Sequence, residues 1–149
     1  MSAESRLNEL GLTLPEAVGP AANYVRYHRT GTLLYISGTG PAEDQPRGKV
    51  GRELSVNQGY EAAYSVGLQL LATARAALGS LDAITRTVKI LGMVNSDPEF
   101  GDHPRVINGC SDLLVDVLGD AGKHTRSAVG FASLPNRIAV EIEATFEVG

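Results

Sequence analysis

The sequence has no tryptophan, few other aromatic residues and a single cysteine. Aromatic residues make up 5% of the 149 residues, which leaves few rings on which nucleic-acid bases could stack. Cys110 is the only cysteine, so an internal disulfide is excluded, in agreement with a reducing compartment. No apolar run approaches the roughly 20 residues that a membrane-spanning helix needs. The N-terminus also lacks the apolar core and cleavage site of a signal peptide. We therefore expect a cytoplasmic protein that does not enter a membrane.

Positive charge is scarce as well. Lys and Arg number 13 against 17 Asp and Glu, which gives a net charge of −4 and a pI of about 5.3. Because proteins that bind a phosphate backbone usually cluster Lys and Arg, nucleic acid is disfavoured as a main partner. Hydrophobic residues make up 43% of the chain, and a domain of this size buries roughly 68–70% of its unfolded surface. We expect one domain over residues 1–149.

The hydrophobic pattern predicts two helices and five strands. One helix begins at Ser55, which forms a capping box with Gln58, and ends at Gly79. A second begins at Asp102 or His103, with Pro104 in its first turn, and ends at Gly119. The predicted strands are a hairpin over 23–37 that turns at residues 30–32, a strand over 84–94, and two strands over 126–132 and 137–148. A polar segment with Pro and Gly over 42–53 reads as a surface loop.

The order ββ, α, β, α, ββ favours an α+β fold with a mixed β-sheet and two helices packed on one face. The last strand alternates apolar residues such as Ile142 and Phe146 with polar ones such as Glu141 and Glu143. We expect the apolar set under the helices. The polar set must then face water, a cleft or the sheet of a partner subunit.

The strand that begins at Arg126 is a candidate binding surface. Arg126, Ala128, Gly130 and Ala132 share one face of it, and we expect Val129 and Phe131 on the other face to enter the core. A guanidinium followed by three small residues makes a trough suited to a small carboxylate, which arginine binds bidentately. The alternative is a structural ion pair between Arg126 and Glu141 or Glu143 on the adjacent strand.

No metal or organic cofactor is expected from the residue pattern. His28, His103 and His124 have no ligand spacing with Cys110, and no Gly-rich phosphate loop follows a strand. We interpret each histidine as a surface or capping residue. We interpret Cys110 as a small buried hydrophobe on the second helix rather than as a redox-sensitive thiol.

Three segments resemble the Rid family, the reactive intermediate deaminases, also described as YjgF-like. The main one is HTRSAVGFASLPNRIAVEIEATFEV, in which an Arg-Ser pair is followed at fixed spacing by Leu-Pro and by a strand containing Glu-Ile-Glu-Ala. The others are Leu33–Gly38, which resembles a family strand ending in Ser-Gly, and Val106–Asn108, which resembles the start of its second helix. The resemblance runs from about residue 19 to residue 148.

The resemblance implies a chorismate-mutase-like subunit that forms a homotrimeric barrel, with one cleft between each pair of subunits. By position, Arg126 would hold the substrate carboxylate and Glu141 would orient water or manage its proton. The substrate site would also include Tyr24, Gly38, Asn108 and Ala128. The implied reaction is cofactor-free hydrolysis of an enamine or imine derived from an amino acid, such as 2-iminopropionate, to a 2-keto acid and ammonia.

The chain departs from the shorter family members at Thr39, Ala128 and Gly130, where those often have Gln, Cys and Glu. It also has an N-terminal extension over residues 1–18, in which Leu7, Leu10 and Leu14 could form a short helix that covers an edge. These differences keep open a second function, the binding of 2-keto acids or related carboxylates without turnover. A ribonuclease or translation inhibitor, an activity attached to the family's older name, fits the acidic pI less well.

Overall fold

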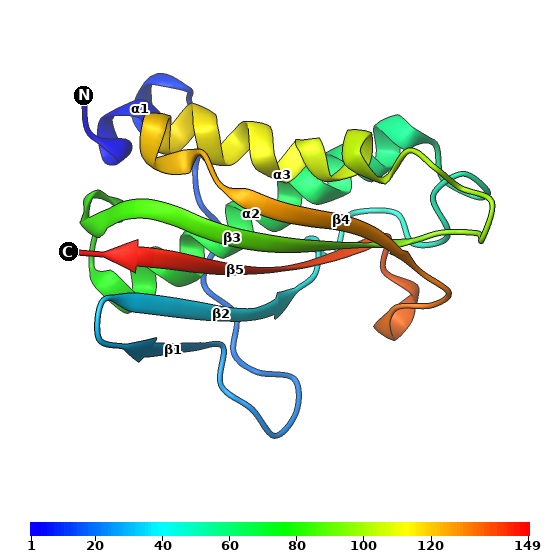
Figure 1. The fold of residues 1–149 in the computed structure, drawn as a ribbon, viewed down its shortest axis with the longest axis horizontal. Helices are drawn as coiled ribbons and strands as arrows, with labels where there is room; N and C mark the ends of the chain where they lie inside the picture. The colour runs from blue at the N-terminus through cyan, green and yellow to red at the C-terminus, as the bar shows by residue number, and fades with distance from the viewer.

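The computed structural model describes all 149 residues, which form three helices and a five-stranded sheet (Figure 1). The helices are α1 (Ala3–Glu9), α2 (Val56–Leu78) and α3 (His103–Leu118). The strands are β1 (Tyr27–Thr30), β2 (Leu33–Thr39), β3 (Ile84–Asn95), β4 (Thr125–Phe131) and β5 (Val140–Val148). Short 3-10 turns lie at Leu81–Ala83, Gly119–Gly122 and Pro135–Arg137.

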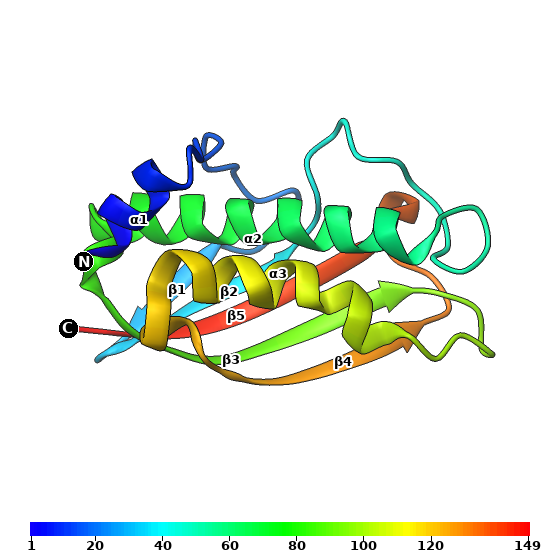
Figure 2. The same cartoon turned by 90° about the horizontal axis from the view of Figure 1, so that it is seen from above.

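The sheet is mixed, and both long helices lie on the same side of it (Figure 2). The strand order is β1-β2-β5-β3-β4, with β3 and β4 parallel and the other neighbours antiparallel. We call the side under α2 and α3 the covered face and the opposite side the open face. The predicted α+β class, mixed sheet and pair of helices on one face are confirmed.

Helix ends and helix contacts follow from local sequence. The Ser55 hydroxyl accepts from the Gln58 backbone N–H at 3.1 Å, and the Gln58 side chain accepts from the Ser55 N–H at 2.9 Å, so the predicted capping box is present. Gly79 ends α2 in the left-handed conformation, with φ of 85°. The two long helices approach closely at Gly109, where a Cβ would overlap with the Tyr60 carbonyl oxygen. Glycine is therefore required at this crossing.

Strand β5 has the alternation that the sequence predicts. Ile142 and Phe146 are fully buried beneath the helices, whereas Glu143 is exposed and Glu141 is partly buried on the open face. No part of this chain covers β5 on that side. The open face is therefore the surface on which a ligand or a partner subunit can lie.

The prediction for the two faces of β4 was wrong. Val129 and Phe131 are 40% and 42% exposed and lie on the open face, whereas Arg126, Ala128 and Gly130 face α3. The register with β3 explains the reversal, because Arg126 pairs with buried Ile90 and so shares its face. As the last strand of the sheet, β4 lies partly beyond the helices, and its apolar side chains need not be inside.

Three predicted boundaries also differ. Strand β5 begins at Val140 rather than Arg137, because Asn136 and Arg137 have positive φ in a 3-10 turn. The first strand begins at Tyr27 rather than Asn23. The N-terminal helix forms, but of the three predicted leucines only Leu7 is buried, since the helix ends before Leu10, which is 48% exposed. This helix packs against α3 and the 81–83 turn instead of covering a sheet edge.

None of the helices combines the length and the apolar composition required to cross a bilayer.

Candidate functional site

Three of the residues implied by the resemblance line one cleft. Tyr24, Gly38 and Glu141 lie on the wall of a cavity of about 750 Å³. The cavity extends from the end of β2 to the 135–137 turn and to Gln69 on α2. We call it the Glu141 cleft.

Glu141 lies directly against the backbone of Gly38. A Cβ at residue 38 would overlap with the Glu141 carboxylate oxygen Oε2, so any larger residue there would require the carboxyl group to move. Partial burial raises the pKa of Glu141, and the neighbouring charge of Glu143 raises it further, while Arg26 opposes the shift. A carboxyl group with a raised pKa can both accept and donate a proton, as general acid–base chemistry requires.

Tyr24 is paired with a second arginine that the sequence analysis missed. Arg26 Nη1 donates to the Tyr24 hydroxyl at 3.2 Å, and the Ala21 backbone N–H donates to the same oxygen at 3.3 Å. These two donors lower the pKa of Tyr24, and the Ala21 N–H has the larger effect. Arg26 follows Tyr24 by two residues, and period-2 alternation of an extended segment was a signal that could have placed both on one face.

Arg126 is held against α3. Its Nη1 donates to the Ser111 hydroxyl at 3.0 Å and its Nη2 donates to the Pro104 carbonyl at 3.4 Å. No carboxylate of this chain forms an ion pair with Arg126, since the ion pairs involve other arginines and a lysine. The predicted alternative, an ion pair with Glu141 or Glu143, is wrong because both glutamates lie on the opposite face of the sheet.

His124 supports Arg126 through Ser111. The His124 Nδ1 lies 2.6 Å from the Gly122 carbonyl, which can only accept, so Nδ1 carries a hydrogen. The Nε2 of neutral His124 is then an acceptor for the Ser111 hydroxyl at 2.9 Å. Ser111 in turn accepts from Arg126. This histidine is partly buried in a hydrogen-bond chain, rather than the surface or capping residue we predicted.

Asn108 and Ala128 lie near Arg126. Residues 104, 108 and 111 share one face of α3, so Asn108 lies on the turn between the two hydrogen-bond partners of Arg126. Ala128 is the next residue on the same face of β4 and packs against the core. We call Arg126, Asn108 and Ala128 the Arg126 cluster. Within one chain Arg126 and Glu141 lie on opposite faces of the sheet, and none of the residues of the Arg126 cluster lines the Glu141 cleft.

A smaller cavity of about 260 Å³ lies at the far end of the Arg126 face, beside Gly130. His103 Nε2 and the Ser96 hydroxyl are 3.4 Å apart there, and a Cβ at Gly130 would collide with both side chains. The glycine that replaces a common Glu of shorter family members therefore leaves space that His103 fills.

Cys110 is fully buried on α3, and burial raises the pKa of its thiol to about 12. It packs in the core as the sequence predicted. No group of three or more His, Cys, Asp or Glu side chains converges in a way that could hold a metal ion.

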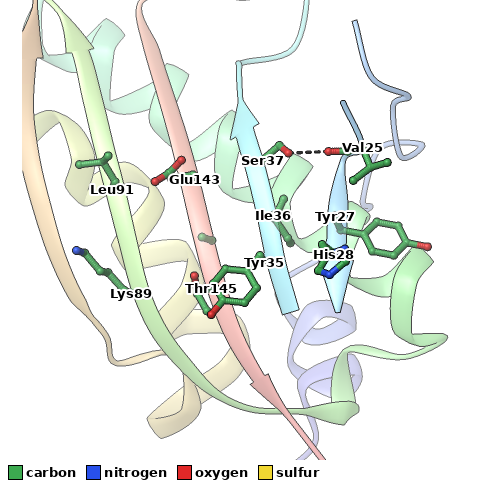
Figure 3. A pocket seen from close by; sticks show the side chains of 11 residues that line it. Val25, Tyr27, His28, Tyr35, Ile36, Ser37, Lys89, Leu91, Glu143 and Thr145 are labelled. Carbon is green, nitrogen blue, oxygen red and sulfur yellow. Dashed lines mark hydrogen bonds between the residues drawn. The ribbon is translucent and has the colours of Figure 1, made fainter. Parts of the chain in front are cut away.

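A shallow hollow of about 300 Å³ lies on the open face, as Figure 3 shows. Lys89 and Leu91 of β3, Glu143 and Thr145 of β5, and Tyr35 of β2 line it. None of the predicted site residues lines this hollow. Its residues belong to the sheet surface that the chain itself leaves uncovered.

Comparison with known proteins covers nearly the whole chain. Residues 4–140 match the family model described as "YjgF/chorismate mutase-like, putative endoribonuclease". Protein TCP17 of Trypanosoma cruzi is 43% identical over 148 residues, which are 97% of this chain and 92% of that protein.

Solved structures agree in fold. Atu1372 of Agrobacterium tumefaciens, a protein of unknown function, has a TM-score of 0.91 and 46% identity, covering 99% of this chain and 92% of its own. A "putative endoribonuclease" of Shewanella oneidensis has a TM-score of 0.94 and 30% identity, covering 99% and 100%. RidA from Psychrobacter has a TM-score of 0.63 and 25% identity, covering 89% and 94%. The chain therefore belongs to the YjgF/chorismate mutase-like family, as its Arg-Ser, Leu-Pro and Glu-Ile-Glu motif predicted.

Proposed function

We propose that the protein is a homotrimeric hydrolase that converts enamines or imines derived from amino acids to 2-keto acids and ammonia. Each active site combines the Glu141 cleft of one subunit with the Arg126 cluster of its neighbour. The observation that supports the proposal is the convergence in one cleft of Tyr24, Gly38 and Glu141, whose pKa is raised by burial, while Arg126 has no carboxylate partner in its own chain.

Exposed apolar side chains and a free strand edge support association of subunits through the open face and the edge of β4. Tyr35, Val129 and Phe131 are each at least 40% exposed on the open face. Strand β4 has a free edge, since β3 is its only neighbour in the sheet. Exposed apolar side chains beside an unpaired edge are typical of a surface that is covered on assembly. A rotationally related neighbour brings its Arg126 cluster to the cleft that lacks one.

The chemistry needs orientation and proton transfer. Arg126 binds the substrate carboxylate through its guanidinium, which places the imine carbon in the cleft. Glu141 accepts a proton as water adds to this carbon, and the proton passes to nitrogen. The C–N bond of the resulting carbinolamine then breaks, the carbonyl forms, and ammonia leaves. For an enamine, protonation at carbon precedes these steps, and the Tyr24 hydroxyl, polarised by two donors, is positioned to supply that proton.

The test is release of ammonia and keto acid from 2-imino acids generated by an amino-acid oxidase. Wild type is compared with Arg126→Ala, after sedimentation shows the same trimeric mass for both. We expect wild type to accelerate release and Arg126→Ala to lose about 100-fold or more in kcat/KM, since charge-assisted binding and orientation are both lost. Equal release with and without wild-type protein, across several imino acids, would overturn the proposal.

The second candidate function is carboxylate binding without turnover. The neutral side chains of Ala128 and Gly130 favour it, because they supply no proton donor or acceptor beside Arg126. It predicts that 2-keto acids raise the melting temperature of the protein while imine hydrolysis stays at the uncatalysed rate. RNA cleavage has less support, since the chain is acidic and has few aromatic residues.

A further inference from the structure

Arg26 is a second cation in the Glu141 cleft, and no carboxylate of the chain lies within ion-pair distance of it, although the charge of Glu141 acts on it from farther away. It donates to three neutral oxygens: Tyr24 Oη at 3.2 Å, the Gly38 carbonyl at 3.2 Å and Thr39 Oγ1 at 2.7 Å. The ion pairs of this chain all involve other residues. Arg26 is also partly buried, whereas the arginine of most of those pairs is well exposed. Partly buried guanidinium groups normally bind an anion, because removing the charge from water is costly.

The hydrogen bonds hold the Arg26 side chain in place without using all of its donors. Nη1 donates to two oxygens and Nη2 to one, so one Nη2 hydrogen remains for a ligand, because a guanidinium has two hydrogens on each Nη. The Nε is buried and is not available from the cleft. A fixed guanidinium with one spare Nη2 donor is thus in place for an anion in the cleft.

Arg26 lies within a short distance of the proposed reaction centre. Its Nη1 binds the carbonyl of Gly38, the residue against which the Glu141 carboxyl rests. An imine carbon beside Glu141 therefore lies close enough to Arg26 for a short carbon chain to connect the two positions. Arg47 lines the same cleft and is bound only to the Asn136 carbonyl, which adds positive charge on this side. Glu43 and Glu141 also line the cleft, but neither pairs with these arginines.

We infer that the cleft is built for a dicarboxylic substrate: a 2-imino or 2-keto acid whose second carboxylate, two or three carbons from the reacting carbon, binds Arg26. This inference rests on the proposed function, in which Arg126 of the neighbouring subunit binds the first carboxylate. A cleft of about 750 Å³ has ample space for a chain of four or five carbons. Arg26 is then a specificity-determining residue.

The test uses two stable keto acids that differ only in the terminal carboxylate. Isothermal titration calorimetry measures the binding of 2-oxoglutarate and 2-oxopentanoate to the wild-type trimer. We expect 2-oxoglutarate to bind about tenfold tighter or more, because one additional charge-assisted contact is made. Equal affinities would overturn the inference without any use of a variant.

Two variants assign the preference to Arg26. In Arg26→Met we expect the affinity ratio to fall close to one. Arg29→Met, which removes an equal charge from the same hairpin outside the cleft, keeps the wild-type ratio. If Arg26→Met does not fold, Arg26→Lys retains a charge without the fork and should lower the ratio part of the way. An Arg26 variant that folds and keeps the full ratio contradicts the assignment.

Binding and turnover are read separately. A dicarboxylate preference without imine hydrolysis supports this inference and contradicts the proposed function. If the protein hydrolyses monocarboxylic imines but binds 2-oxoglutarate and 2-oxopentanoate equally, the proposed function is supported and this inference is contradicted.

Discussion

Glu141 occupies a position in which folding and reactivity favour different protonation states. Burial beside Gly38 and the charge of Glu143 raise its pKa, so the folded protein binds this proton more tightly than the unfolded chain does. Protonated Glu141 therefore favours the native state. The contribution of Glu141 to the free energy of unfolding is largest at acidic pH, below the ordinary carboxyl pKa. This contribution is lost as pH rises through the higher pKa of the folded state. Above that pKa the ionised carboxylate is available as a base, at some cost in stability.

We predict that Glu141→Gln lowers kcat by about 100-fold or more, since it removes the proton-transfer group. The same variant should melt at a higher temperature than wild type at pH 7, and the difference should vanish near pH 4. Thermal denaturation across pH 4–8 measures this. Glu143→Gln is the matched control, because it removes the neighbouring charge and leaves the catalytic carboxyl in place. A Gln variant that is less stable than wild type at pH 7 would contradict this assignment of Glu141.

Ser111 links Arg126 to His124. The hydroxyl accepts from the arginine and donates to the imidazole, so it fixes the guanidinium above the Asn108 turn of α3. Ser111 does not itself contact the cleft. It is a positioning residue, and its effect should appear in substrate binding more than in the chemical step.

Accordingly, Ser111→Ala should raise KM by roughly tenfold with little change in kcat, because a hydrogen bond to a charged group contributes about 1.5–3 kcal/mol. Ser111→Thr keeps the hydroxyl and should restore KM. Steady-state kinetics on one imino acid distinguishes the two variants. An unchanged KM in Ser111→Ala, with Arg126→Ala impaired, would show that Arg126 needs no help from Ser111.

At the scale of elements, α1 is attached by two buried side chains, Ala3 and Leu7, and by one ion pair. Leu7 is 3% exposed within the main core, and Glu4 accepts from Arg75 at 2.7 Å and from the Leu81 N–H at 2.9 Å. The pKa of Glu4 lies below its ordinary value, mainly because of the Arg75 guanidinium and to a smaller extent because of the Leu81 N–H. The helix thus joins the N-terminus to α2 and to the start of β3.

Leu7→Ala should lower the free energy of unfolding by about 2–3 kcal/mol, as expected for a buried Leu. Leu10→Ala, three residues later and 48% exposed, should change it by less than about 0.5 kcal/mol. Urea denaturation at one fixed protein concentration compares the two variants. Similar small effects for both would mean that α1 is not part of the cooperative core.

The elements that the sequence predicted well are those with a local cause. Ser55 and Gln58 cap α2 through their own side chains, and alternation in β5 places Glu141 on the open face whatever the neighbours do. The faces of β4 were not predictable in this way. Val129 and Phe131 look like core residues in the sequence, but their orientation depends on the pairing of Arg126 with Ile90, a non-local register.

The sequence could name candidate site residues but not their arrangement. Motif spacing pointed to Arg126 and Glu141 as candidates, yet it could not reveal that the two side chains lie on opposite faces of the sheet. Period-2 alternation could have placed Arg26 on the face of Tyr24, but the sequence could not show its contacts with Gly38 and Thr39 of β2, which are 12 and 13 residues away. Spacing within one short segment does not reveal contacts with a neighbouring strand.

At the scale of the whole molecule, the proposed function makes one subunit carry two incomplete parts of a site. In that proposal the Glu141 cleft supplies a base and a hydroxyl, and the Arg126 cluster supplies the carboxylate anchor on the β4 side of the sheet. Rotation about the threefold axis of the proposed trimer brings the second part of one subunit to the first part of the next. The proposal therefore makes activity a property of the assembly and not of the single chain.

The most direct measurement is complementation between two inactive variants. Arg126→Ala and Glu141→Gln are each purified, mixed in equal amounts, unfolded and refolded together, and assayed for imine hydrolysis. In randomly assembled trimers about a quarter of the sites combine an intact Arg126 from one subunit with an intact Glu141 from the next, since each has an even chance. We predict that the mixture recovers about a quarter of wild-type activity while each variant refolded alone stays inactive. A mixture as inactive as its components, with trimers formed, would contradict a site shared between subunits.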